Sequence, residues 1–231
     1  MSFRFKQFFI EDSKCAMKVG TDGVLLAAWA PVSELKIKNS KLRILDVGTG
    51  SGLIARMLMQ RCPEAEVEGI DIDEAAVEQA RENGVKAFVS SLQNWQGSYD
   101  LIVSNPPYFQ NSLKNPDEGR KAARHTDTLS YAELIHHSAR LLTEHGQLAL
   151  ILPAEAENEI RQLAAAADLF LTHATRVYSK ENKKPKRVLL AFEKLKIKNY
   201  ELKISEDTLI LEDEKGGRSA AYSELCKEFY L

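Results

Sequence analysis

A proline-rich turn near the middle of the chain is where side chains are best placed to do chemistry. The residues Asn105-Pro106-Pro107-Tyr108 follow an apolar run, 99–103, that predicts a buried strand. Each proline fixes its own φ and keeps the preceding residue extended, so the turn is stiff and its carbonyls point outward. The Asn105 amide oxygen and the Pro106 carbonyl oxygen can each accept one N–H, and Tyr108 offers a ring for stacking. The turn therefore suits a flat substrate with an NH2 group, although four residues could also be only a proline-rich exit from a strand.

A glycine loop upstream favours the first interpretation. A short apolar strand runs into Asp46-x-Gly48-x-Gly50-x-Gly52, and a helical stretch begins at Leu53. A strand, a glycine loop and a helix in that order form a nucleotide-cofactor site, because bare backbone lets a ligand approach closely. A dinucleotide fingerprint needs G-x-G-x-x-G, and its third glycine would fall on Leu53. The spacing therefore disfavours a dinucleotide.

The glycine spacing resembles motif I of class I S-adenosylmethionine (SAM) methyltransferases. Asn-Pro-Pro-Tyr resembles the signature of those that methylate planar amino groups, either N6 of adenine or the glutamine side-chain amide. The resemblance implies that the loop containing Asp46 meets the methionine end of SAM. It also implies that Asp71, which ends a strand over 67–71, accepts the ribose hydroxyls, and that Ile72 lies against the adenine.

Related enzymes often carry an aspartate that accepts from the adenine amino group, and this chain departs from that pattern. Ser90 and Ser91 occupy the region instead, so we expect Ser91 to accept this hydrogen bond without charge, with Leu92 beside it. Asn105 is expected to border the cofactor as well as the target. Asp73 is more simply the N-cap of the next helix.

Alternating strands and helices predict a doubly wound α/β sheet. The class I resemblance, over roughly residues 40–195, implies a Rossmann-like sheet of seven strands with the last antiparallel. We expect residues 1–40 to be an N-terminal extension packed on the core. Residues 41–231 would form the methyltransferase domain, ending in a small hairpin over 200–212 and a helix over 219–229.

A closer resemblance joins both ends of the chain to the central turn. The segments 3–8, 15–26, 104–108 and 229–231 look like those of the tRNA1(Val) (adenine(37)-N6)-methyltransferase family. That family methylates the adenine next to the anticodon of a valine tRNA. The resemblance implies that the target amine attacks the SAM methyl group directly and displaces the sulfur. The two N–H groups of the amine would donate hydrogen bonds to Asn105 and Pro106.

The same resemblance suggests which residues hold the target base. Pro107 and Tyr108 would contact the flipped adenine, and Lys18 and Thr21 would frame its pocket. Thr21 or Asp22 could equally be no more than the cap of the short apolar helix that follows. Residues 3–10 predict a strand or hairpin arm, which is either a lid over one end of the core or an RNA-contacting arm.

Composition limits the partners. The net charge of −2 gives no global attraction to nucleic acid, so local basic segments must hold a tRNA. Lys183, Lys184 and Lys186 lie in a basic run over 180–198, and a second basic segment lies in a long loop over 109–126. Each could bind phosphates or be only a solvated surface.

Other features argue against a membrane or a metal. The three scattered cysteines have neither disulfide nor zinc spacing, and His136 and His137 point in different directions on a helix. No run is long enough for a membrane span. We therefore expect a cytoplasmic monomer without a metal.

Two alternatives stay open. A protein-glutamine N5-methyltransferase shares Asn-Pro-Pro-Tyr, but it would be expected to carry a separate N-terminal helical domain, for which about 40 residues are too few. A SAM-binding RNA module without catalysis is the other, and an intact Asn105 argues against it.

Overall fold

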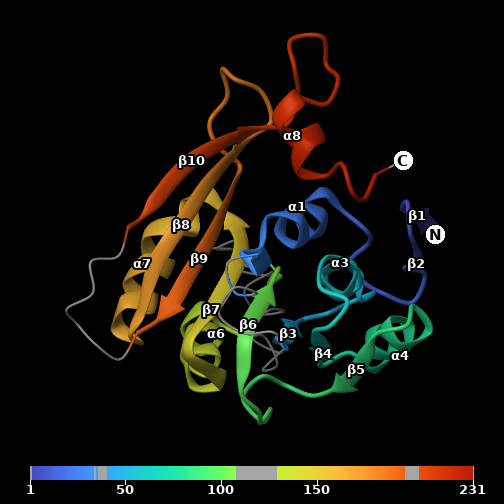
Figure 1. The fold of residues 1–231 in the computed structure, drawn as a ribbon, viewed down its shortest axis with the longest axis vertical. Helices are drawn as coiled ribbons and strands as arrows, with labels where there is room; N and C mark the ends of the chain where they lie inside the picture. The colour runs from blue at the N-terminus through green and yellow to red at the C-terminus, as the bar shows by residue number, and fades with distance from the viewer. Residues whose placement is uncertain (1, 34, 36–40, 108–128, 196–202, 231) are drawn as a thin grey trace, which may run out of the picture.

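Eight strands form one sheet in the order β10-β8-β9-β7-β6-β3-β4-β5. The computed structural model describes residues 2–33, 35, 41–107, 129–195 and 203–230. The strands are β3 (Arg43–Val47), β4 (Glu66–Asp71), β5 (Lys86–Val89), β6 (Tyr99–Ser104), β7 (Leu142–Pro153), β8 (Leu169–Tyr178), β9 (Arg187–Lys194) and β10 (Ser205–Ile210). All run parallel except β9, which is antiparallel to both of its neighbours. The expected seven strands with an antiparallel last member are thus present, and β10 adds an eighth (Figure 1).

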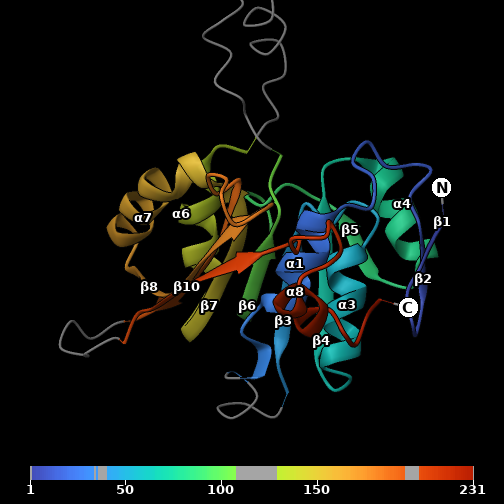
Figure 2. The ribbon, with the colours of Figure 1, turned by 90° about the horizontal axis from the view of Figure 1, so that it is seen from above.

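Helices cover both faces of the sheet, because consecutive residues of its central strands are apolar and both faces must be buried. They are α1 (Thr21–Trp29), α3 (Leu53–Arg61), α4 (Glu74–Glu82), α6 (Tyr131–Leu141), a short 3-10 turn η1 (Ala154–Ala156), α7 (Glu157–Ala166) and α8 (Ala220–Leu225). In β3 the neighbours Ile44 and Leu45 belong to opposite apolar clusters. The Ile44 side packs with α1, α3 and α4, and the Leu45 side packs with α6 and α7 (Figure 2).

The parallel strands end together at one side of the sheet, which we call the carboxyl end. Val47 of β3 lies in register with Ser104 of β6, and β4 ends on Asp71 nearby. Open α/β sheets bind their ligands beyond this end of the strands. The two sequence motifs, one after β3 and one after β6, therefore meet here.

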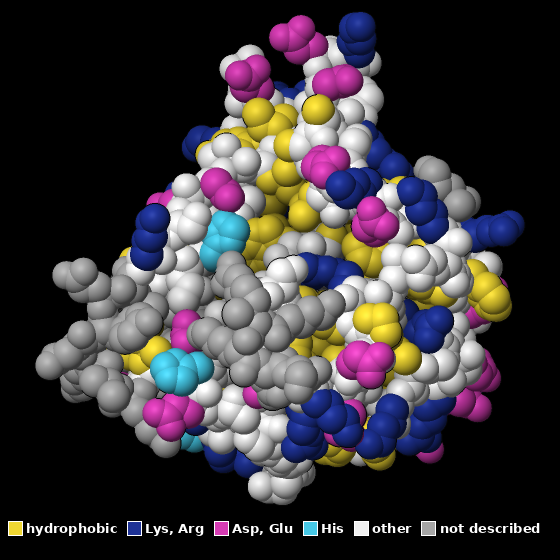
Figure 3. All heavy atoms as spheres, in the orientation of Figure 1, with side chains coloured by type: hydrophobic (Ala, Val, Ile, Leu, Met, Phe, Trp, Pro, Cys, Tyr) yellow, Lys and Arg dark blue, Asp and Glu magenta, His cyan; other side chains and the backbone are white. Residues whose placement is uncertain are grey.

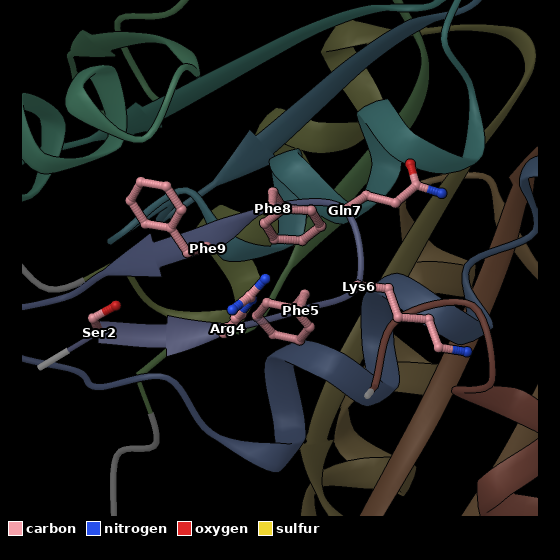
Figure 4. A pocket seen from close by; sticks show the side chains of 7 residues that line it. All are labelled: Ser2, Arg4, Phe5, Lys6, Gln7, Phe8 and Phe9. Atoms are coloured by element: carbon pink, nitrogen blue, oxygen red, sulfur yellow. The ribbon is translucent and has the colours of Figure 1, made fainter.

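The two ends of the chain lie against each other, as Figure 1 shows. The antiparallel strands β1 (Ser2–Arg4) and β2 (Phe9–Glu11) form a hairpin. At its turn, the Lys6 N–H donates to the Phe229 carbonyl at 2.9 Å, and the Phe5 ring stacks on Tyr230 with centroids 6.1 Å apart. An open hollow of about 500 Å³ lies on this hairpin, bounded by Ser2 and residues 4–9 (Figure 4). None of the predicted site residues lines it.

Three local expectations are corrected. Gly20 is the N-cap of α1 without a side-chain cap; Asp22 instead accepts from Arg187 Nε at 2.9 Å, because both Thr21 and Asp22 already lie inside the helix. Residues 205–210 do not form one arm of a hairpin but pair in parallel with β8, which covers an otherwise open strand of the sheet. The terminal helix is shorter than expected, Ala220–Leu225, with Ser219 as its N-cap. By contrast, Asp73 caps α4 as expected, accepting from the Ala75 N–H at 2.9 Å.

Candidate functional site

The glycine loop after β3 is built as a cradle that opens to solvent on one side. Gly48, Gly50 and Gly52 have φ values of 72°, 53° and 78°, a region that favours glycine. A Cβ added to Gly48 or Gly50 would meet nothing within 4 Å, whereas one on Gly52 would lie 2.7 Å from Val85 Cγ2. The first two glycines therefore leave space for a ligand, and the third lets the start of α3 pack closely against Val85 and against Ala80 of α4. This arrangement fits the methionine end of SAM.

Asp46 supports the cradle from below. Its side chain is fully buried, and its Oδ2 accepts from Thr49 Oγ1 at 2.8 Å and from the Ala55 N–H at 3.2 Å. Within the described residues its Oδ1 has no hydrogen-bond partner. Burial raises the pKa of the carboxyl group to about 7. Asp46 thus ties the loop to the start of α3.

Asp71 joins the end of β4 to the cradle. Its Oδ2 accepts from the Gly50 N–H at 2.9 Å, and its Oδ1 accepts from the Asp73 N–H at 3.0 Å. Each carboxylate oxygen can accept more than one hydrogen bond, and the side chain is only half-buried. The carboxylate can therefore hold the loop and still accept the ribose hydroxyls.

Apolar side chains are exposed beside Asp71. Ile72 is 55% exposed, and Val89, which lies in register with Asp71, is 50% exposed. Together they can flank a purine ring. Val89 is a candidate that the sequence analysis did not name, although its place at the end of β5 was a usable signal. Ser91 is half-buried, while Leu92 is buried in the apolar core on the side of α6 and α7.

The target turn begins where β6 ends. Ser104 is buried and its Oγ donates to the Val47 carbonyl at 2.9 Å, which fixes the turn against β3. Asn105 is half-buried, Pro106 is buried and Pro107 is exposed. Asn105 and the glycine loop therefore follow adjacent strands. Tyr108 and the loop over 109–126 lie outside the described residues.

The N-terminal signature lies beside this turn. Met17 Sδ is 3.8 Å from Asn105 Nδ2. The Lys18 ammonium donates to three backbone carbonyls, those of Asp12, Ser13 and Cys15, at 2.7, 3.3 and 2.9 Å. Thr21 is exposed in the first turn of α1. Lys18 thus orders its own loop, and Met17, which sequence reasoning missed, makes the contact with Asn105.

The basic run over 180–198 is divided by β9. Lys183, Lys184 and Lys186 are exposed in the connection between β8 and β9, at the carboxyl end of the sheet. Lys194 lies at the opposite end and donates to the carbonyls of Ala139 and Leu142 at 2.6 and 2.9 Å. Eight residues of strand separate the two ends by roughly 25 Å. Among the described residues of the run, those before β9 therefore lie at the same end of the sheet as the site, and Lys194 does not.

Among the described residues, no group of three or more His, Cys, Asp or Glu side chains could hold a metal ion. In the same part of the chain, every helix is too short or too polar to cross a membrane.

A glycine cradle and an acidic strand end on this doubly wound sheet define a class I SAM-dependent methyltransferase fold. Solved structures with the same fold include a predicted O-methyltransferase from Agrobacterium tumefaciens, with a TM-score of 0.68 and 16% identity over 90% of this chain and 96% of that one. A putative class I SAM-dependent methyltransferase from Listeria monocytogenes has a TM-score of 0.62 and 15% identity over 89% of this chain and 70% of that one.

The family model of the methyltransferase small domain matches residues 32–170. Relatives named tRNA1(Val) (adenine(37)-N6)-methyltransferase include those of Bacteroides fragilis, 41% identical, and Parabacteroides distasonis, 43% identical. Each alignment covers 99% of this chain and 97% of the relative. The chain belongs to the tRNA1(Val) (adenine(37)-N6)-methyltransferase family.

Proposed function

We propose that the protein transfers a methyl group from SAM to N6 of the adenine next to the anticodon of a valine tRNA. One observation supports this most directly: Val47, before the glycine cradle, pairs in register with Ser104, before Asn105. A cofactor in the cradle and an amine at Asn105 would lie side by side. The relatives' names supply the RNA substrate.

The chain's part in the chemistry is to orient the amine. SAM, when bound, supplies an electrophilic methyl group. An aromatic amine is a poor nucleophile because its lone pair is delocalised into the ring. Asn105 Oδ1 and the Pro106 carbonyl would accept hydrogen bonds from the two N–H groups of the amine. This favours a pyramidal amine nitrogen with its lone pair directed at the methyl group. Holding the two reactants in line supplies much of the acceleration.

Proton removal needs no strong base. Once methylated, the nitrogen is a far stronger acid and can lose its proton to water. The adenine must leave its stack to reach Asn105, and an unpaired anticodon loop lowers the cost of this step. Pro107, which is exposed, and Tyr108 would contact the flipped base.

The cofactor residues act before this step. Gly48 and Gly50 would admit the methionine end of SAM, Asp71 would accept its ribose hydroxyls, and Ile72 and Ser91 would border its adenine. We further propose that the protein works in the cytoplasm and as a monomer. Light scattering of the purified protein at several concentrations would test whether it is a monomer.

A labelled-methyl assay tests the function. The wild type should methylate a valine tRNA transcript, and mass spectrometry should identify N6-methyladenosine at the anticodon-adjacent position. A transcript with guanine at that position should not be labelled. Asn105→Ala should retain SAM affinity yet lose most methyl transfer, because the amide faces the target. Label in a glutamine-containing protein, with none in tRNA, would contradict the proposal and favour a protein methyltransferase.

A further inference from the structure

The segment over residues 12–19, which we call the signature loop, is held in one shape from several sides. The Lys18 ammonium binds three of its carbonyls, and the buried Asp12 carboxylate accepts from the Val19 N–H at 3.0 Å. Gln79 of α4 accepts from Ser13 Oγ and from the Lys14 N–H at 3.2 and 3.3 Å. A loop ordered by so many hydrogen bonds can hold one side chain at a fixed place.

One side chain of this loop, that of Met17, contacts the target turn. It is 50% exposed, so packing in the core does not explain its position. Its sulfur lies 3.8 Å from Asn105 Nδ2, a contact between residues 88 positions apart in the sequence. A thioether sulfur is a weak acceptor and has no hydrogen to donate. The contact therefore favours the NH2 end of the amide, because turning the oxygen toward sulfur would bring two acceptors together.

We propose that Met17 is a positioning residue that sets the orientation of the Asn105 amide. With the amide nitrogen directed at the sulfur, the oxygen is the amide atom that can accept from the target amine. The reversed amide would present its own N–H groups to the N–H groups of the substrate. This inference rests on the proposed function, since it gives Asn105 the role of acceptor.

Three substitutions at Met17 separate the sulfur's acceptor role from its bulk. Met17→Leu keeps the apolar bulk and removes the acceptor, and we expect kcat to fall about five- to tenfold. Met17→Gln has a similar length and offers an amide oxygen as a stronger acceptor, so kcat should stay within about twofold of the wild type. The kcat of Met17→Ala should fall at least as far as that of Met17→Leu. The affinity for SAM, measured by calorimetry, should be unchanged in all three.

A double-mutant cycle identifies Asn105 as the partner. Asn105→Asp keeps an oxygen that can accept from the target but has no N–H to offer the sulfur. In that background Met17→Leu should cause no further loss in the single-turnover rate. As a matched control, Ile204→Ala removes an apolar side chain that is 52% exposed before β10, at the opposite end of the sheet. That variant should methylate tRNA like the wild type.

The outcomes distinguish this inference from the proposed function. A wild type that does not methylate tRNA contradicts the function itself. An active wild type with an unaffected Met17→Leu, or with equal losses in Met17→Leu and Met17→Gln, overturns the role of the sulfur. Loss of SAM affinity in Met17→Leu would instead assign Met17 to the cofactor site. If the losses of rate from Met17→Leu and Asn105→Asp were additive in the double mutant, Asn105 would be excluded as the partner of Met17.

Discussion

At the scale of single residues, Asp71 holds the glycine loop and is proposed to bind the ribose of SAM, so one substitution would remove both interactions. Its carboxylate accepts from the backbone N–H groups of Gly50 and Asp73 and is placed to accept the ribose hydroxyls of SAM. We expect Asp71→Ala to weaken SAM binding by about 1.5–3 kcal/mol, the range for hydrogen bonds to a charged group. Calorimetric titration with SAM measures the change. Unchanged affinity in a folded Asp71→Ala protein would remove Asp71 from the site.

Asp46 makes a prediction about pH. Burial raises its pKa from 3.8 to about 7, so between these values the folded protein holds a proton that the unfolded chain has lost. The free energy of unfolding should therefore decrease as the pH rises from about 4 to 7, by at most about 1.4 kcal/mol per unit from this group. Asp46→Asn mimics the neutral form and should lack this contribution.

Urea unfolding at several pH values measures the effect as a difference between the two proteins. Contributions from all other groups are shared and cancel in the comparison. The wild type should lose stability relative to Asp46→Asn as the pH increases through this window. A constant difference at every pH would mean that Asp46 has an ordinary pKa in the folded protein.

At the scale of elements, the glycines of the loop after β3 have different roles. Gly50 faces open space, so Gly50→Ala should cost only about 1–2 kcal/mol of backbone strain but should weaken SAM binding at least tenfold. Gly52 adds to that strain an overlap with Val85, so Gly52→Ala should destabilise the fold by roughly 2–5 kcal/mol. Urea unfolding without SAM and calorimetry with SAM measure the two effects separately. Equal losses of stability in both variants would contradict these different roles for Gly50 and Gly52.

The elements that the sequence predicts well are those with a local pattern. The strand before Gly48, the acidic end of β4 and the Asp73 cap each depend on neighbouring residues, and the structure has all three. The contact of Met17 with Asn105 joins residues 88 apart, and no local pattern encodes it. Lys18 looks like a free cation in the sequence because its partners are backbone carbonyls, which every residue has.

At the scale of the whole molecule, the reversal of β9 decides which charges can serve the site. A run of lysines appears continuous in the sequence, but an antiparallel strand carries the chain from one end of the sheet to the other. Lys180 pairs with Glu212 at 3.3 Å, and Lys194 binds carbonyls at the far end. Among the described residues of the run, the exposed lysines between β8 and β9 are therefore the best placed to meet RNA phosphates.

The triple variant Lys183→Ala/Lys184→Ala/Lys186→Ala should weaken tRNA binding and flatten its salt dependence. Each lost phosphate contact should lower the slope of log affinity against log salt by roughly 0.7–0.9, because fewer counterions are released. SAM affinity should not change, since these side chains lie in a different connection from the cradle. Filter binding of tRNA at several salt concentrations measures the slope, and calorimetry measures SAM.

A matched control separates local placement from net charge. Lys41, Lys86 and Lys203 lie at the opposite end of the sheet, before β3, at the start of β5 and before β10. Replacing these three by alanine changes the net charge equally, so both triple variants would bind tRNA alike if only total charge mattered.

Tyr108→Ala should behave differently again. It should reduce methylation sharply with little change in the slope of log affinity against log salt, because a stacked base carries no phosphate contact. If the variant between β8 and β9 binds and methylates tRNA like the wild type at every salt concentration, those lysines are only a solvated surface, and the basic residues of the 109–126 loop become the next ones to replace.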